Sequence, residues 1–402
     1  LRAPAPRAGG LGPGGGALSV TCLCAALDPG VVRGLLVLEG LLLCRAYLAW
    51  RASRRPGVGT ARDLSIVIPL KGWDEGLPSL IRTLLASEVD AAVEILLVLD
   101  EDHPRQGELP THERFRLIHP APLPEGWRDK NWRLSQGLAS ASYECILFLD
   151  SDVSATEQTL ARRLADHAGV FSYAIPVYAE PGTKAERLLA AFTSYSNFFL
   201  YRAGVALGVR ETAIGPSMLF TVGRQRLAEA LHVVRGALAD DHALGHYFGT
   251  RGEPVCCARE PVFVTKHGDG FADVFSQILR WLMLPRTVAH LLTLRLVVVV
   301  LIGSLLNSAA GLVTYAGLAW SLLEPSPTGF GILAAGGLLL LSEALALVIV
   351  ERAYARDRYP RRAWRHLLWL PITLLLQPFL LAAATLRRRI PWRGALIPAK
   401  KV

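Results

Sequence analysis

The chain has 402 residues, 51% of them apolar, and a mean hydropathy of +0.33, which is high for a purely soluble protein. Its formal net charge is +9 at pH 7, but the arginines gather at the ends of apolar runs and not on one helix face, which argues against a nucleic-acid partner. The six cysteines have neither metal-site spacing nor the pattern of a disulfide framework.

The N-terminal part contains one apolar segment after a Gly-, Pro- and Ala-rich stretch. Residues 1–30 are predicted to be disordered. The apolar segment 31–51 predicts a membrane helix that either spans the bilayer or lies in its interface. A spanning helix is favoured, because Arg51, Arg54 and Arg55 form a basic flank that suits the cytosolic side.

Between residues 60 and 286 short apolar strands alternate with helices. Strands are expected at 64–69, 94–99, 115–119 and 144–149, and helices at 77–86 and 130–141. This alternation predicts an α/β domain with a parallel sheet covered on both faces. Ligands of such sheets bind beyond the carboxyl ends of the strands, and Asp100 and Asp150 each come directly after a predicted strand.

Residues 288–386 contain three long apolar runs that predict membrane helices. The runs 296–323 and 330–350 are each long enough to span a bilayer. The loop between them has no Lys or Arg and is therefore expected to face away from the cytosol.

The third run, 364–386, is interrupted by Pro371 and Pro378 and has basic residues on both sides. These features fit a re-entrant or interfacial hairpin better than a clean span, and a kinked full span stays open. The basic segment 387–402 is predicted to be a cytosolic tail.

Two acidic segments follow predicted strands and are candidates for binding a phosphorylated ligand. In Asp150-Ser151-Asp152, one carboxylate could hold a ribose and the other a divalent metal, Mg²⁺ or Mn²⁺. Asp100 could recognise a uracil or a ribose, and Asp102 lies in the same turn. The alternative for each segment is an ordinary polar turn.

The adjacent carboxylates Asp240 and Asp241 are candidates for proton transfer. Like charges repel and burial raises a carboxyl pKa, so one of the two could accept a proton near neutral pH, and Asp241 is the expected base. The alternative is that either residue caps a helix expected at 244–248, a role that is compatible with catalysis.

Gln277, Arg280 and Trp281 share one face of a predicted helix just before the first long apolar run. Arg280 could clamp a diphosphate, and Trp281 could form an apolar wall for an acceptor. The alternative is an amphipathic helix end anchored at the membrane interface.

Three further residues are weaker candidates. Lys71 and Lys130 could touch phosphate or base, although such lysines are usually solvated. His267 could be a late ligand for a metal or a phosphate, although a single His is more often structural.

In this order the motifs resemble the membrane-bound glycosyltransferases of family 2, and among them the ceramide glucosyltransferase-like branch. The resemblance rests on Pro69-Leu70-Lys71-Gly72, Asp100-Glu101-Asp102, Asp150-Ser151-Asp152, Asp241, Gln277-x-x-Arg280-Trp281 and, in the tail, Trp392-Arg393-Gly394. It departs from the family at Asp240, where Glu is usual, and in segment 126–132, which looks more like bacterial lipid or carotenoid glycosyltransferases.

The resemblance implies a GT-A type, Rossmann-like nucleotide-sugar domain, an inverting mechanism and a divalent metal. Its site residues would be Asp241 as base; Pro69, Lys71, Asp100, Asp102, Lys130 and Asp150 for the nucleotide sugar; Asp240, Gln277, Arg280 and Trp281 for acceptor and diphosphate; and Asp152 and His267 for the metal.

The expected function is transfer of a sugar, from a UDP-hexose, to a lipid acceptor at the cytosolic face of a bacterial inner membrane. The implied partners are the nucleotide-sugar donor, the lipid and the membrane. A polysaccharide synthase of the same fold and a non-catalytic membrane-anchored binding protein are the alternatives.

Overall fold

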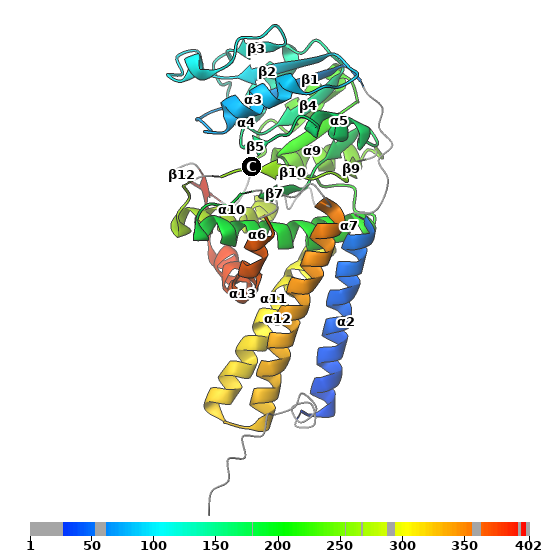
Figure 1. Cartoon of the computed structure of the whole chain (residues 1–402), viewed down its shortest axis with the longest axis vertical. Coiled ribbons are helices and arrows are strands. Elements are labelled where there is room, and N and C mark those ends of the chain that lie inside the picture. The colour runs from blue at the N-terminus through cyan, green and yellow to red at the C-terminus, as the bar shows by residue number, and fades with distance from the viewer. Residues whose placement is uncertain are drawn as a thin grey trace, which may run out of the picture.

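The computed structural model describes residues 27–52, 62–178, 180–253, 255–266, 268–287, 294–355, 363–392 and 395–398. Most of segment 1–30, the flanking Arg54 and Arg55, and His267 lie outside the described residues. An α/β domain stands at one end of a group of long helices, and further helices lie across the junction between the two (Figure 1).

The α/β domain is built on a sheet with the strand order β3-β2-β1-β4-β8-β6-β9. The strands are short, with the bounds β1 (Leu64–Pro69), β2 (Val93–Val98), β3 (Phe115–Ile118), β4 (Cys145–Leu149), β6 (Phe171–Tyr173), β8 (Ser217–Phe220) and β9 (Val255–Cys257). β1 pairs in parallel with β2 and β4, and β2 with β3, as the sequence predicts.

β8 runs antiparallel to both β4 and β6, so the sheet is mixed. The four strands expected from the sequence are parallel to one another, as predicted, and β8 is an additional strand that the sequence analysis did not propose. A hydrophobic pattern determines which side chains face the core, whereas the direction of a strand depends on the connection that leads into it.

Helices cover both faces of the sheet, because alternate side chains of the buried strands point into two apolar layers. Ile66 and Ile68 face the layer that includes α3 (Leu77–Ala86) and α5 (Thr159–Ala165). Val67 faces the other layer, where α4 approaches so closely that a Cβ on Gly137 would meet Val67 Cγ1 at 2.3 Å. This second layer is formed by α4 (Asp129–Ala139), α8 (Arg224–Val233) and α9 (Asp240–Gly249).

A smaller sheet in the order β5-β10-β7 lies beyond the end of β4. Its strands are β5 (Val153–Ser154), β7 (Pro176–Tyr178) and β10 (Val262–Val264). The antiparallel pairing of β5 with β10 brings Thr265 next to Asp152, whose carbonyl accepts a hydrogen bond from the Thr265 backbone N–H at 2.9 Å. The segment after β10 therefore lies beside the acidic segment after β4.

Helices α6 (Lys184–Ser196) and α10 (Phe271–Thr287) lie across the junction between the domain and the long helices (Figure 1). α6 begins with a capping box in which Thr183 and Glu186 satisfy each other's backbone N–H groups. It continues through a π-helical segment, η2 (Asn197–Arg202), into α7 (Ala203–Ala206). The remaining short elements are η1 (Gln106–Glu108), β11 (Arg389–Trp392) and β12 (Ala395–Pro398).

The long helices are α2 (Pro29–Ala52), α11 (Leu294–Leu323), α12 (Pro327–Ala355) and α13 (Leu370–Leu386), the last preceded by the 3₁₀ segment η5 (Ala363–Trp369). Within the described ranges, three segments are long and apolar enough to cross a membrane: Leu296–Leu323, Pro327–Tyr354 and His366–Leu386. α13 contains Pro378, and its 17 residues would extend roughly 26 Å, a little less than the hydrocarbon core of a bilayer.

α2 differs from these segments because Arg33, Glu39 and Arg45 interrupt its apolar sequence. Arg45 is buried and pairs with Glu343 of α12. It also donates to Asn307 of α11 and, at 2.8 Å, to the Tyr195 hydroxyl of α6. Arg45, one of the charges that make α2 less apolar than a typical membrane helix, therefore connects α2 to α6, α11 and α12.

Candidate active site

Lys130 connects two of the acidic segments at the end of the sheet. It lies in the first turn of α4, Asp150 directly follows β4, and Asp240 is the first residue of α9. Lys130 Nζ is 2.9 Å from Asp150 Oδ1 and 3.3 Å from Asp240 Oδ2. Burial lowers the pKa of Lys130, but the carboxylates outweigh it and raise that pKa above its usual value, so the amine is charged.

Asp240 is the most buried of these carboxylates, with 8% of its side chain exposed. Burial raises its pKa to about 6, and the neighbouring Asp241 and Asp150 act in the same direction, while Lys130 opposes them. The predicted residues Lys130, Asp150 and Asp240 thus meet in one half-buried cluster.

Asp152 lies beside this cluster and fits a metal ligand. Its Oδ1 atom is buried and has no hydrogen-bond partner among the described residues. Burial, with Asp150 and Asp74 next in effect, raises its pKa to about 7. An unpaired buried carboxylate oxygen is a suitable ligand for Mg²⁺ or Mn²⁺. The described residues hold no group of three His, Cys, Asp or Glu side chains that could enclose a metal, and His267 is outside them.

Asp100 is held by a residue that the sequence reasoning missed. Arg133 NH2 donates to both carboxylate oxygens of Asp100, at 2.8 and 2.9 Å, and Arg133 Nε lies 3.3 Å from Asp129. Lys71 is 3.5 Å from Asp129 and thus belongs to the same group. Its spacing could have indicated it, since Arg133 comes one helical turn after Lys130 and so lies on the same face of the helix.

Pro69 and Asp102 lie at the same end of the sheet without joining these contacts. Pro69 is the last residue of β1, and Asp102 is exposed in the turn after β2.

Asp241 is the second residue of α9, which begins at Asp240 and not near residue 244. The capping position is Ala239, whose side chain accepts no hydrogen bond, so the capping alternative is wrong for both aspartates. Carboxylates in a first helical turn are favoured by the helix dipole. Asp241 Oδ1 accepts from the backbone N–H of His242 at 2.8 Å, and a Cβ on Gly215 would lie 3.2 Å from Asp241 Oδ2.

Gln277 is joined to the segment after β10 by Lys266, a second residue that the sequence reasoning missed. Lys266 Nζ donates to Gln277 Oε1 and lies 3.1 Å from Asp269 Oδ2. The charges of Asp152 and Arg280 both act on the buried hydroxyl of Tyr178, whose pKa is raised mainly by burial. The helix with Gln277 and Arg280 therefore lies close to the Asp152 side of the site.

Trp281 is half-buried and packs against the apolar cluster that α6, α10 and α13 form at the junction. This position suits either an acceptor wall or an interfacial anchor, the two roles that the sequence left open.

The comparison with known families matches residues 35–401 to a family described as "Glycosyl transferase family 21". This chain belongs to glycosyl transferase family 21. It is therefore a glycosyltransferase with an α/β nucleotide-sugar fold and helices that could span a membrane. The assignment to family 2 and to its ceramide glucosyltransferase-like branch stays a prediction.

Among solved structures, the chain is similar to a mannosyltransferase from Pyrobaculum calidifontis in complex with GDP-Man and Mn²⁺. The two are 16% identical over 87% of this chain and 96% of that chain, with a TM-score of 0.44. It is also similar to glucosyl-3-phosphoglycerate synthase from Mycobacterium tuberculosis in complex with Mn²⁺, UDP and phosphoglyceric acid. Here the identity is 15% over 60% of this chain and 84% of that chain, with a TM-score of 0.36. At these TM-scores the likeness is too loose to transfer a substrate or metal. No curated protein matches the chain.

Proposed function

We propose that this glycosyltransferase transfers a hexose from a UDP-hexose to the hydroxyl of a lipid acceptor, with inversion at the anomeric carbon. The observation that carries the proposal is the cluster of Lys130, Asp150 and Asp240 at the end of the sheet. Asp152, with its buried Oδ1, lies beside the cluster, and Asp241 follows Asp240 in α9. Together these residues provide a cation, a candidate metal ligand and a candidate base.

On the donor side, Asp100 and Asp150 would bind the uridine, because both follow strands at the end of the sheet where nucleotides bind in such folds. Arg133 supports this role, since its two hydrogen bonds fix the carboxylate of Asp100 while 46% of that side chain stays exposed. Lys130 and Arg280 would bind the diphosphate, which carries the negative charge that develops when the sugar departs.

A divalent cation would be held by Asp152 and would neutralise the diphosphate. The buried Oδ1 of Asp152 supports this role. Asp152 must lose its proton to bind the cation, which links metal binding to pH.

On the acceptor side, Asp241 would take the proton of the acceptor hydroxyl. The oxygen would then attack the anomeric carbon as the bond from that carbon to the diphosphate oxygen breaks, and UDP would leave. Gly215 supports this assignment, because its lack of a side chain leaves space beside Asp241 Oδ2.

The proposal of a lipid acceptor is supported by the position of the site next to helices that could span a membrane. We place residues 60–286 as the catalytic domain on the cytosolic side of a bacterial inner membrane, with 31–51 and 288–386 in the membrane and 387–402 as a cytosolic tail. Arg51 at the end of α2 and Arg387–Arg389 after α13 agree with the preference of basic residues for the cytosolic side.

The purified full chain, incubated with a panel of UDP-sugars, Mn²⁺ and a bacterial lipid extract, tests the proposal. The expected result is release of UDP together with lipids heavier by one hexose in mass spectrometry. A ladder of added hexoses would instead indicate a polysaccharide synthase. Absence of UDP release with every donor would refute the proposal.

A further inference from the structure

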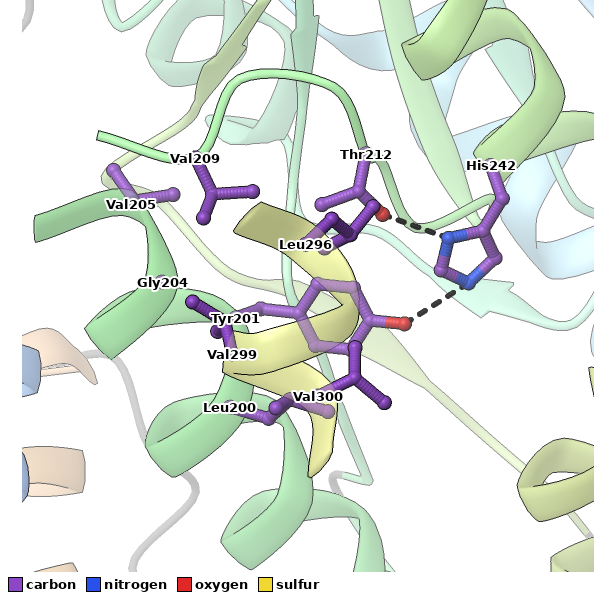
Figure 2. A pocket seen from close by; sticks show the side chains of 10 residues that line it. All are labelled: Leu200, Tyr201, Gly204, Val205, Val209, Thr212, His242, Leu296, Val299 and Val300. Atoms are coloured by element: carbon purple, nitrogen blue, oxygen red, sulfur yellow. Dashed lines mark hydrogen bonds between the residues drawn. The ribbon is translucent and has the colours of Figure 1, made fainter. Parts of the chain in front are cut away.

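An apolar cavity of about 50 Å³ lies where the start of α9 meets the start of α11 (Figure 2). Val205 and Val209 line one side, and Leu296, Val299 and Val300 of α11 line another. Since one water-sized group needs about 10–15 Å³, the cavity has room for roughly four such groups.

One end of the cavity is polar and is formed by His242. Its Nδ1 is 2.7 Å from Thr212 Oγ1, and its Nε2 is 3.0 Å from the Tyr201 hydroxyl (Figure 2). A neutral imidazole can satisfy both hydroxyls, because it donates from one ring nitrogen and accepts at the other. The ring is therefore held in place from two sides.

This polar end adjoins Asp241. The backbone N–H of His242 donates to Asp241 Oδ1 at 2.8 Å. The pKa of Tyr201 is raised by burial and, in addition, by the charge of Asp241. The charge of the proposed base, Asp241, thus reaches Tyr201, which lines the cavity.

The other side of the cavity belongs to a helix with an apolar outer surface. Leu294 is 79% exposed and Leu301 is 59% exposed, and both lie on α11 close to the cavity-lining Leu296 and Val299. α11 is one of the helices long and apolar enough to cross a membrane. A ligand that enters along this surface would come from the bilayer, so it must itself be apolar over most of its length.

We propose that the cavity binds the hydrocarbon segment next to the hydroxyl of the acceptor, a long-chain lipid alcohol. This inference rests on the proposed function and adds a binding site to it. The cavity accepts only the first few carbons, while the rest of the chain stays in the bilayer. The hydroxyl then lies at the end formed by His242, beside Asp241. Each buried methylene contributes a factor of about four in affinity, so filling the cavity weakens acceptor binding strongly.

Gly204 provides the test, because a Cβ there would lie 3.7 Å from Val299 Cγ1 and 3.8 Å from Val209 Cβ. In Gly204→Leu the added side chain occupies the cavity. Gly337→Leu is the matched control, since Gly337 is exposed in α12 and its Cβ would meet nothing within 4 Å. The probe is a long-chain alcohol with a diazirine on the fourth carbon, photolysed with the full chain in detergent micelles.

The expected result is cross-linking to peptides that contain residues 200–212 and 296–300, at least tenfold weaker in Gly204→Leu than in wild type or Gly337→Leu. Hydrolysis of the UDP-sugar without acceptor stays unchanged in both variants. Equal labelling of the cavity by a phosphatidylcholine with a diazirine in its acyl chain would overturn the proposal, because the cavity would then hold ordinary bilayer lipid.

A second pair of variants covers the case in which Gly204→Leu does not fold. Val299→Ala enlarges the cavity, whereas Val298→Ala removes the same atoms from the exposed side of α11. Val299→Ala should shift the preference for transfer toward alcohols with a methyl branch near the hydroxyl, and Val298→Ala should not. If wild type glycosylates lipid alcohols and the two variants have the same preference, the cavity assignment is wrong while the proposed function stands. If wild type glycosylates none although the probe labels the cavity, the proposed function is wrong.

Discussion

Replacing Lys130 by Met removes the ammonium group between Asp150 and Asp240 but keeps the length of the side chain. Breaking a buried ion pair costs about 3–5 kcal/mol, and the Asp240 side chain is buried enough, at 8% exposed, for that range to apply. The half-buried Asp150 adds at most about 1 kcal/mol. We therefore expect Lys130→Met to lose about 3 kcal/mol of unfolding free energy at pH 8.

The loss should shrink at low pH. The pKa of Asp240 in the folded protein, about 6, is above the value of 3.8 for the unfolded chain, so its proton stabilises the fold and stability falls as the pH rises between the two values. Without Lys130 the pKa of Asp240 rises further, because Lys130 lowers it in wild type. The pH range over which the fold loses stability therefore extends to higher pH in the variant. At pH 5 Asp240 is mostly protonated in both proteins, so the variant and wild type should differ little.

Thermal unfolding of the full chain in detergent micelles at pH 5, 6.5 and 8 measures the effect. A loss of about 3 kcal/mol corresponds to a fall in Tm of roughly 6–12 °C for a domain of this size. Lys71→Met is the control, because Lys71 is 49% exposed and its pair with Asp129 should contribute less than about 1 kcal/mol. If Lys130→Met loses no more stability than Lys71→Met, or if its loss is equal at pH 5 and pH 8, Lys130 does not stabilise the fold by pairing with the ionised Asp240.

Three further predictions concern other contacts. Arg133→Lys replaces a two-bond contact with Asp100 by a single point charge, and UDP binding measured by calorimetry should weaken at least about tenfold; unchanged affinity would contradict this. Burial lowers the pKa of His167 to about 4, so wild type should lose stability as the pH falls from about 6.5 to 4, and His167→Gln should lose less over that window in thermal unfolding. Arg45→Met should cost about 3–5 kcal/mol by leaving Glu343 buried without its cation, and adding Glu343→Leu should recover much of that loss in Tm; a further fall in the double variant would contradict it.

The local elements could be predicted from the sequence because their signals are local. The strand 64–69 and the helix 77–86 have the predicted bounds. A buried apolar run and a proline near a helix start are both features of a few consecutive residues. The first turn of α9 was placed too late, because Asp240 and Asp241 look like caps when their burial is unknown.

The contacts that assemble the site could not be predicted, because they join residues far apart in the chain. Lys130 lies between Asp150 and Asp240, which belong to different elements of the fold. Arg45 pairs with Glu343 across 298 positions, so the sequence showed only an unfavourable charge in an apolar helix. The candidate acids could be singled out as carboxylates beside predicted strands and helices. Of the two cations that were missed, Arg133 had only its spacing of one helical turn from Lys130, and Lys266 had no pattern that distinguished it from a solvated side chain.

In the proposed reaction, Asp241 accepts the proton of the acceptor hydroxyl. Asp241→Asn keeps the shape of the side chain and removes its ability to take a proton at neutral pH. We expect sugar transfer to the lipid acceptor to fall roughly 10²–10⁴-fold while the affinity for UDP stays within about twofold of wild type. Sugar transfer at the wild-type rate in Asp241→Asn would show that Asp241 is not the base.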